Sequence, residues 1–124
     1  MADKNISNRA RGEKRRRRVR GKIHGTAERP RLTVTKSLNH VYAQIVDDLS
    51  QKTLLGLGSG SRELADSFGA KDTKIDKARK VGQALAEKAI EQGIKKVVFD
   101  RNRYRYHGRI KAVGEGAREK GLEF

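Results

Sequence analysis

The chain has 124 residues, which suits a single domain with one modest core. Its 30 Lys and Arg residues outnumber its 15 Asp and Glu residues, and the net charge of +15 indicates a polyanionic partner, most simply a nucleic acid. The sequence excludes a membrane protein, because no stretch approaches the roughly 20 apolar residues of a spanning helix. The absence of cysteine excludes disulfides and thiolate chemistry.

The first 31 residues form a strongly basic segment, with twelve Lys and Arg residues against three acids and a net charge of +9. Apolar residues in it are few and show no helical or strand period, so it cannot bury enough surface to offset its ordering entropy. A transit peptide is disfavoured, because four consecutive arginines do not alternate with apolar residues. We therefore predict that residues 1–29 are a disordered tail in the free chain, which binds nucleic acid through Arg15, Arg16, Arg17, Arg18, Arg20 and Lys22.

The folded domain is expected over residues 30–124 and begins with a β-meander. Residues 31–36 alternate and contain β-branched side chains, which predicts a half-buried strand. After a short turn at 37–39, residues 41–46 predict a second strand with Val41, Ala43 and Ile45 on one face. A polar turn at 47–52 leads to a weaker third strand at 53–57. Connections this short imply antiparallel neighbours.

The second half predicts a helix, a strand and a helix. Residues 58–72 read as an exposed loop, and Thr73 is a candidate N-cap with Asp76 in the capping-box position. The helix runs to about Gln92, and Gly93 is a candidate C-cap. Its expected buried stripe, at spacings of three and four, consists of Ile75, Ala78, Val81, Leu85, Ala89 and Ile90.

The apolar run at residues 96–100 suits a strand buried on both faces, in a central or parallel position. Strand, helix, strand is a crossover unit, so this strand should lie parallel to one of the meander strands. A final helix from about Arg109 to Lys120 is expected to bury Ile110, Val113 and Ala117, with Gly121 ending it. The order βββαβα predicts an α/β domain with a single mixed sheet and packed helices.

The loop at residues 101–109 contains four arginines and two tyrosines. Guanidinium groups match phosphate oxygens, and tyrosine rings offer planes for unpaired bases. This interleaving suits single-stranded or irregular RNA, whose bases are splayed. The alternative places Tyr104 and Tyr106 in the core, with the arginines merely solvated. One tyrosine can be structural while the other binds.

Other motifs argue against an enzyme. The glycine-rich segment 56–62 matches neither dinucleotide-binding nor P-loop spacing, and is read as a flexible strand exit. A two-metal nuclease needs several converging acids, whereas Asp47 and Asp48 fit a turn and Asp100 a strand end or an arginine partner. The three histidines show no metal-ligand spacing. We expect no catalytic residue, metal or cofactor.

Segments spread over the whole chain resemble the bacterial family of large-subunit ribosomal protein eighteen: residues 29–32, 40–44, 95–101, 106–112 and 121–124. The blocks Lys-Lys-Val-Val-Phe-Asp-Arg and Tyr-His-Gly-Arg are the specific ones. The resemblance implies a ribonuclease-H-like sheet with the fourth strand beside the first. It also implies a cytoplasmic, ribosome-bound protein that binds 5S rRNA in the central protuberance and helps attach it to 23S rRNA. Proteins of families five and twenty-five, which also associate with 5S rRNA, are the implied partners.

The residues and the family resemblance assign the same roles to the tail and to the domain. Tail arginines provide affinity without sequence information, and the domain provides specificity. The rival class is a free-standing architectural DNA-binding protein, which is disfavoured because the long helix mixes Lys with Glu and Asp. The turn at 36–40 and the loop at 59–62 are further candidates for specific contacts. The candidate RNA-binding residues of the domain are Arg31, Lys36, Ser37, Asn39, His40, Tyr42, Arg62, Arg101, Arg103, Tyr104, Tyr106, His107, Gly108, Arg109 and Lys111.

Overall fold

The computed structural model describes residues 4–20 and 25–124. After an N-terminal helix, its elements follow the predicted βββαβα order of the α/β class. One short 3-10 helix is added between the third strand and the long helix. The elements are α1 (Lys4–Arg20), β1 (Arg31–Lys36), β2 (Val41–Asp47), β3 (Lys52–Gly58), η1 (Arg62–Ser67), α2 (Lys74–Glu91), β4 (Val98–Asp100) and α3 (Gly108–Glu119).

The strands form one mixed sheet in the order β3-β2-β1-β4. β1 and β2 are antiparallel, as are β2 and β3, which confirms the meander. β4 runs parallel to β1, so the crossover and the place of the fourth strand beside the first are also confirmed. Leu32 of β1 pairs with Ile45 of β2 on one side and with Phe99 of β4 on the other, so three apolar residues lie side by side across the sheet.

A central position for the fourth strand is wrong, because β4 lies at the edge of the sheet. Val97 is fully buried just before it, but Val98 and Phe99 are half-buried. The end of the chain covers this edge: Val97 N donates to Glu123 O at 3.0 Å, and the rings of Phe99 and Phe124 stack at 5.4 Å. The apolar run is therefore explained by the C-terminal segment and not by a strand on each side.

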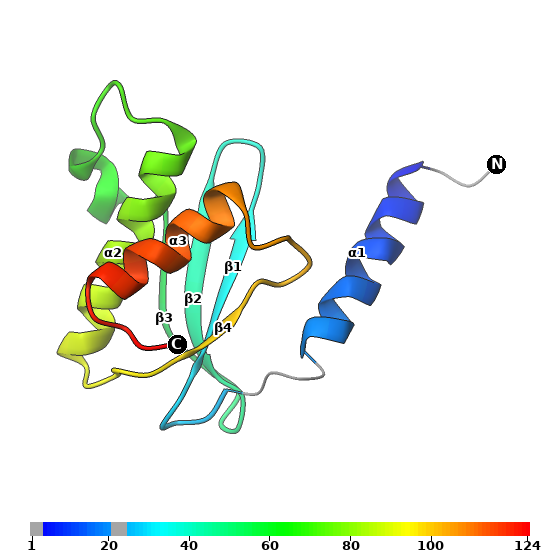
Figure 1. Cartoon of the computed structure of the whole chain (residues 1–124), viewed down its shortest axis with the longest axis horizontal. Helices are drawn as coiled ribbons and strands as arrows, with labels where there is room; N and C mark the ends of the chain where they lie inside the picture. Colours follow the sequence, from blue (N-terminus) through cyan, green and yellow to red (C-terminus); the bar gives the residue numbers. More distant parts are fainter. Residues whose placement is uncertain (1–3, 21–24) are drawn as a thin grey trace.

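Helices α2 and α3 cover one face of the sheet and pack against each other (Figure 1). Small residues permit this approach, because a Cβ on Gly82 would overlap the backbone of Val113 and one on Gly116 that of Arg79. The core confirms the predicted strand face and most of the helical stripes. Its fully buried members include Leu32, Val34, Ala43, Ile45, Ala78, Val81, Leu85, Ala89, Ile110, Val113 and Ala117.

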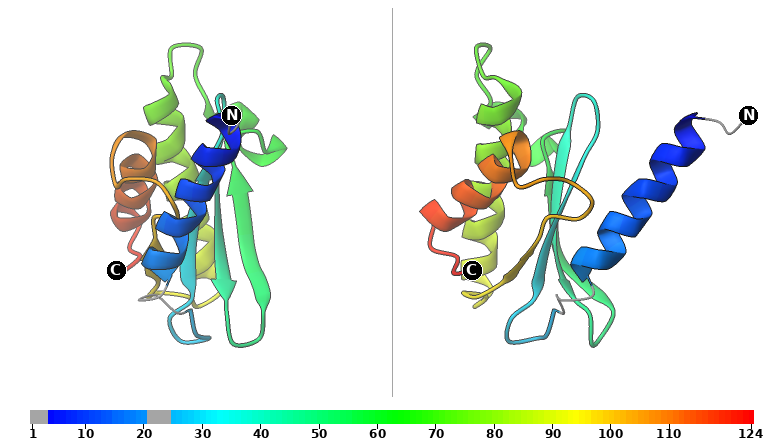
Figure 2. Two further views of the ribbon diagram at one scale, coloured as in Figure 1. Left: turned by 90° about the vertical axis from the view of Figure 1, so that its right-hand side faces the viewer. Right: turned by 45° about the vertical axis from the view of Figure 1, so that its right-hand side comes forward.

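The opposite face of the sheet has no such helical layer (Figure 2). We call it the open face; it carries Thr33 and Thr35 of β1, Tyr42 and Gln44 of β2, and Gly56 and Gly58 of β3. Because side chains alternate along a strand, these residues point away from the core that their neighbours form. The described part of the chain contains no helix long and apolar enough to cross a membrane.

The predicted N-cap of helix α2 is confirmed, and its C-cap is Gln92, one residue before the predicted Gly93. Thr73 Oγ1 accepts from Asp76 N at 3.2 Å and Asp76 Oδ2 accepts from Thr73 N at 3.0 Å, which completes the capping box. Gly93 follows the helix with φ +84°, a left-handed conformation that glycine adopts readily. Ile75 is an exception to the buried stripe: it is 50% exposed, because the first turn of α2 lies at the rim of the α2–α3 contact.

Two segments differ from the expected irregular backbone. The loop at 58–72 contains η1, which buries Leu64. In the tail, Lys4–Arg20 forms α1, which lies on the side of the open face and away from α2 and α3 (Figure 2). α1 has no apolar stripe, and a helix without one gains little from packing. Because α1 gains so little from packing, its presence here does not test the prediction that the tail is disordered in the free chain.

Candidate nucleic-acid interface

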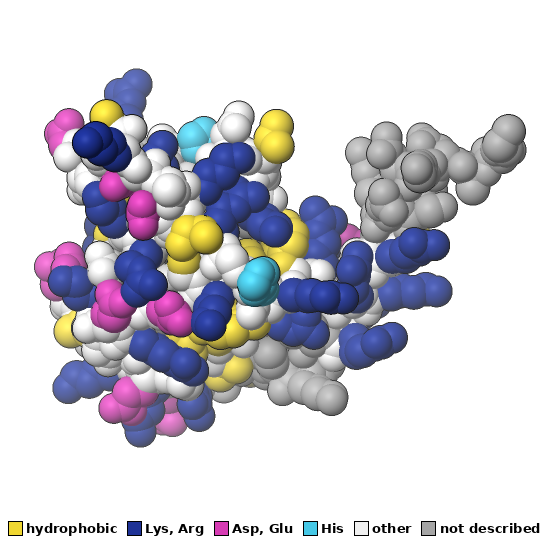
Figure 3. Space-filling view, turned by 45° about the horizontal axis from the view of Figure 1, so that its top comes forward, with side chains coloured by type: hydrophobic (Ala, Val, Ile, Leu, Met, Phe, Trp, Pro, Cys, Tyr) yellow, Lys and Arg dark blue, Asp and Glu magenta, His cyan; other side chains and the backbone are white. Residues whose placement is uncertain are grey.

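Three candidate segments meet at one end of the sheet. β1 and β4 run parallel and end there, β2 begins there, and β3 ends beside it. We call the segments 36–40, 59–62 and 101–109 together the basic end. In Figure 3, which brings this end forward, Lys, Arg and His side chains share the surface, whereas most Asp and Glu side chains lie toward α2 and α3.

Hydrogen bonds join the three segments of the basic end. The Tyr104 hydroxyl donates to Lys36 O at 3.2 Å, and Arg109 Nη1 donates to Ser37 O at 2.9 Å. His40 Nδ1 lies 3.1 Å from Ser59 Oγ. Residues about 70 positions apart in the sequence are thereby held on one surface. An interface whose shape is fixed before binding loses less conformational entropy when a partner arrives.

The loop at 101–109 is held from within by its own polar groups. Asp100 Oδ1 accepts from Asn102 N at 2.8 Å, and Asn102 adopts a left-handed backbone with φ +60°. Arg101 Nη1 donates to Tyr104 O at 2.8 Å, so this guanidinium shapes the loop. Arg103 is exposed and its guanidinium lies 5.5 Å from the centre of the Tyr104 ring. Arg103 therefore presents its charge more openly than Arg101 does.

Both tyrosines of the loop have structural contacts. Tyr106 packs edge-on against Phe99 at 5.3 Å between ring centres and keeps 38% exposure. Tyr104 is half-buried against the core, and Lys36 Nζ lies 5.3 Å from its ring centre. Tyr104 therefore fits the interpretation that packs these rings into the domain only in part, and Tyr106 stays exposed; RNA binding by either ring stays a prediction. The most exposed tyrosine is Tyr42, at 44%, on the open face.

Arg31 is removed from the candidate RNA-binding residues, because its guanidinium is used inside the protein. It is only 9% exposed; Nη1 donates to Asp100 at 2.7 Å, and Nε and Nη2 each donate to Asp48 at 3.0 Å. Burial alone would lower the pKa of Arg31, but the hydrogen bonds to Asp48 and Asp100 outweigh it and raise that pKa. Asp48 Oδ2 also accepts from Gly25 N at 2.7 Å, which ties the last part of the tail to the sheet.

The carboxylates behave as structural groups. Asp100 is fully buried beside Arg31, which confirms the arginine-partner interpretation. Asp47 Oδ1 accepts from Leu49 N at 3.0 Å, as expected of a turn. Within residues 4–20 and 25–124, no group of three or more His, Asp or Glu side chains is placed to hold a metal ion.

The tail presents its cations along α1. Arg15, Arg17 and Arg18 are exposed, whereas Arg16 forms an ion pair with Glu13. A hydrogen bond from Arg16 lowers the pKa of Glu13, so this carboxylate is ionised at neutral pH. A Cβ on Gly12 would lie 2.9 Å from Arg103 Cδ, which places α1 next to the loop at 101–109. The side chain of Arg20, and Lys22 as a whole, lie outside the described residues.

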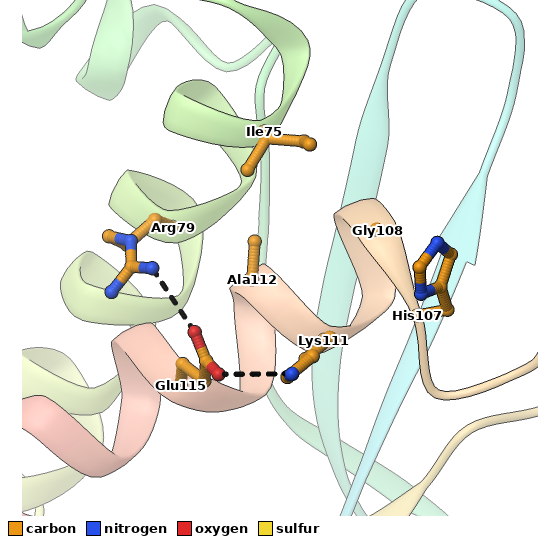
Figure 4. Close-up of a pocket in the computed structure, with 7 residues that line it drawn as sticks. All are labelled: Ile75, Arg79, His107, Gly108, Lys111, Ala112 and Glu115. Atoms are coloured by element: carbon orange, nitrogen blue, oxygen red, sulfur yellow. Dashed lines mark hydrogen bonds and ion pairs between the residues drawn. The ribbon is translucent and has the colours of Figure 1, made fainter.

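The remaining candidates fall into two groups. Asn39, His40 and Arg62 are exposed at the basic end. His107, Gly108 and Lys111 instead line a groove between α2 and α3, together with Ile75, Arg79, Ala112 and Glu115 (Figure 4). Glu115 pairs there with Arg79 at 3.1 Å and with Lys111 at 3.8 Å, so Lys111 is turned away from the open face and partly neutralised.

One cation of the basic end was missed from the sequence. Lys74 Nζ donates to Leu38 O at 2.7 Å, and so adds a positive charge beside the turn at 36–40. The sequence contained one indication of this contact. Lys74 is the first residue of α2, where a positive charge is unfavourable beside the positive end of the helix dipole, so a contact elsewhere was to be expected.

The fold and the surface define a basic α/β domain whose cations gather at one end of a mixed sheet and along an N-terminal helix. The family model described as ribosomal L18 of archaea, bacteria, mitochondria and chloroplasts matches residues 6–124. The chain is 54% identical over 112 residues to the large ribosomal subunit protein uL18 of Anaeromyxobacter sp. (strain K), covering 90% of this chain and 93% of that protein. It is 51% identical over 119 residues to the protein of the same name from Chlorobaculum parvum, covering 96% and 98%.

The chain therefore belongs to the ribosomal L18 family. It is a ribosomal protein, with a structural and not an enzymatic role.

Proposed function

We propose that this protein is a structural component of the large ribosomal subunit that binds 5S rRNA and helps attach it to 23S rRNA in the central protuberance. Its further partners there are 5S-associated proteins of families five and twenty-five, and its location is the ribosome in the cytoplasm. The family match and the names of the relatives support the ribosomal part of this proposal.

The observation that carries the RNA part is the joining of three separate segments into the basic end by the contacts of Tyr104, Arg109 and His40. A folded RNA is recognised mainly by its shape, and a surface held by internal hydrogen bonds can match a shape. The tail 1–29 is expected to add sequence-independent phosphate contacts, while the domain 30–124 selects the RNA.

The direct test is a footprint of the full chain on total rRNA. We expect strong protection of 5S rRNA, with any further protection confined to the part of 23S rRNA that adjoins it. Competition between 5S rRNA and tRNA at one salt concentration should favour 5S rRNA. Protection spread evenly over all rRNA, or equal competition by tRNA, would contradict the proposal.

A second candidate function is that of an architectural DNA-binding protein. One observation favours it: α1 carries four consecutive arginines, and a basic helix fits the DNA major groove. It predicts that random duplex DNA competes as well as 5S rRNA in the same assay. We favour rRNA as the partner, because the chain belongs to a ribosomal protein family and the basic end includes exposed turns and loops besides the basic helix.

A further inference from the structure

We propose that the ring of Tyr42, on the open face of the sheet, is a platform on which one unpaired nucleobase of the bound RNA stacks. The inference rests on the proposed function and deepens it by naming a site and the chemical group that the site takes. Tyr42 is the ring that the packing of the domain uses least, since Tyr104 and Tyr106 both contact the core or the edge of β4.

The position of Tyr42 follows from the alternation of β2. Val41, Ala43 and Ile45 point into the core, so Tyr42 points to the other side, where it is 44% exposed. In the sheet it pairs with Gly58 of β3 and with Thr35 of β1. Neither neighbour has a side chain large enough to cover the ring.

The glycines of β3 let the ring lie flat. A Cβ on Gly58 would come within 2.8 Å of Tyr42 Cδ2, and one on Gly56 would overlap the phenolic oxygen. The ring therefore lies across the backbone of β3, with one side against the two glycines. Aromatic rings do shield glycines in sheets for structural reasons. A ring with that role alone needs no open side, whereas Tyr42 keeps nearly half of its surface in contact with solvent.

The surroundings of Tyr42 suit a nucleobase. Gln44 is two residues further along the same face and pairs with Gly56, so its amide can donate to or accept from the edge of a stacked base. The basic helix α1 lies on this side of the sheet (Figure 2), where its arginines can contact the phosphates that flank the base. A neutral platform bordered by cations is the usual arrangement for unpaired nucleotides.

The chain contains no tryptophan, which makes a direct test available. In Tyr42→Trp the new indole is the sole tryptophan of the full chain, and stacking on a base quenches its fluorescence. Leu49→Trp is the matched control, because Leu49 is 78% exposed in the turn after β2, at the other end of that strand. At saturation with 5S rRNA we expect strong quenching of Tyr42→Trp and little change in Leu49→Trp.

Affinity provides the second readout. Tyr42→Phe keeps the aromatic plane and should bind 5S rRNA as the unchanged chain does. Tyr42→Leu removes the plane and should bind roughly five- to a hundredfold more weakly, since a stacked base contributes about 1–3 kcal/mol. Melting temperatures of the variants show whether the fold is intact. If Tyr42→Leu does not fold, quenching of Tyr42→Trp decides the question.

The outcomes separate the inference from the proposed function. Tight binding of 5S rRNA without quenching of Tyr42→Trp overturns the platform and leaves the proposed function in place. Full affinity of a folded Tyr42→Leu does the same. Failure of the unchanged chain to prefer 5S rRNA overturns the proposed function and the platform with it.

Discussion

Arginine occurs in two dense groups in this chain, one along α1 and one in the loop at 101–109, and the two groups have different surroundings. In the loop, Arg101 and Arg109 are half-buried and donate to backbone carbonyls of Tyr104 and Ser37. On α1, Arg15 and Arg18 are exposed, and neither forms a hydrogen bond or ion pair with another residue that the structure describes.

An arginine can therefore fix the shape of a surface or supply positive charge to a partner, depending on whether its N–H groups bond within the protein. Arg101 and Arg109 use part of their donors to hold the loop and the turn at 36–40 in place, so they influence which RNA fits. Arg15 and Arg18 of the tail keep their donors for phosphate oxygens, so they raise affinity for any polyanion. Arg31 is the extreme case, because its whole guanidinium is engaged within the domain.

The largest effect is expected when Arg31 is truncated. Arg31→Ala removes the guanidinium that pairs with the buried Asp100 carboxylate, and breaking such a buried pair costs about 3–5 kcal/mol of unfolding free energy. Arg101→Ala is the matched control: it removes one hydrogen bond to a carbonyl and should cost about 0.5–1.5 kcal/mol. Urea unfolding of both variants measures the difference. Equal losses would show that the buried pair stabilises the fold no more than a single hydrogen bond does.

Removal of residues 1–22 should have the next largest effect, on affinity and not on stability. The deletion removes ten Lys and Arg residues, six of which are the predicted phosphate contacts Arg15, Arg16, Arg17, Arg18, Arg20 and Lys22. Each lost phosphate contact lowers the slope of log K against log salt by roughly 0.7–0.9, so the slope should flatten by about 4 or more if all six contact RNA. Filter binding to 5S rRNA over a salt series measures this. An unfolded truncated chain, or an unchanged slope, would contradict the conclusion that the tail supplies phosphate contacts and is not needed for the fold.

A smaller effect, on selectivity, is expected from detaching the loop from the turn at 36–40. Arg109→Ala removes the bond to Ser37 O, and Tyr104→Phe removes those to Lys36. Each should reduce the preference for 5S rRNA over tRNA roughly two- to tenfold, corresponding to about 0.5–1.5 kcal/mol per hydrogen bond. Arg17→Ala on α1 is the control and should weaken both RNAs alike. The same selectivity loss in all three variants would mean that the two arginine groups do not differ.

The smallest effect concerns Glu13, which pairs with Arg16. Because the pKa of Glu13 is lowered, the carboxylate is charged at neutral pH and becomes neutral only in more acidic solution. Glu13→Gln should therefore tighten binding to 5S rRNA and to tRNA slightly and equally at pH 7. The gain should vanish as the pH falls through the lowered pKa, where the unchanged chain loses the same charge. A gain restricted to 5S rRNA would place Arg16 among the specific contacts.

The positions and buried faces of the helices and strands could be predicted from the sequence. Alternation at Val41, Ala43 and Ile45 set the buried face of β2, and Thr73 with Asp76 marked the start of α2, because these signals act between residues close in the chain. The sequence also determined the family through blocks such as residues 95–101.

Tertiary structure alone decided which candidate side chains are available. In the sequence Arg31 resembles the other basic candidates. In the structure it contacts Asp48 and Asp100, which are 17 and 69 residues away along the chain. Tyr42 and Tyr104 are equivalent as residue types, but the fold exposes them differently. Strand pairing sets Tyr42 over two glycines, whereas the loop at 101–109 places Tyr104 against Lys36. The edge position of β4 likewise depends on the C-terminal segment that covers it. Contacts between distant residues leave no period or spacing in a single sequence, so packing must reveal them.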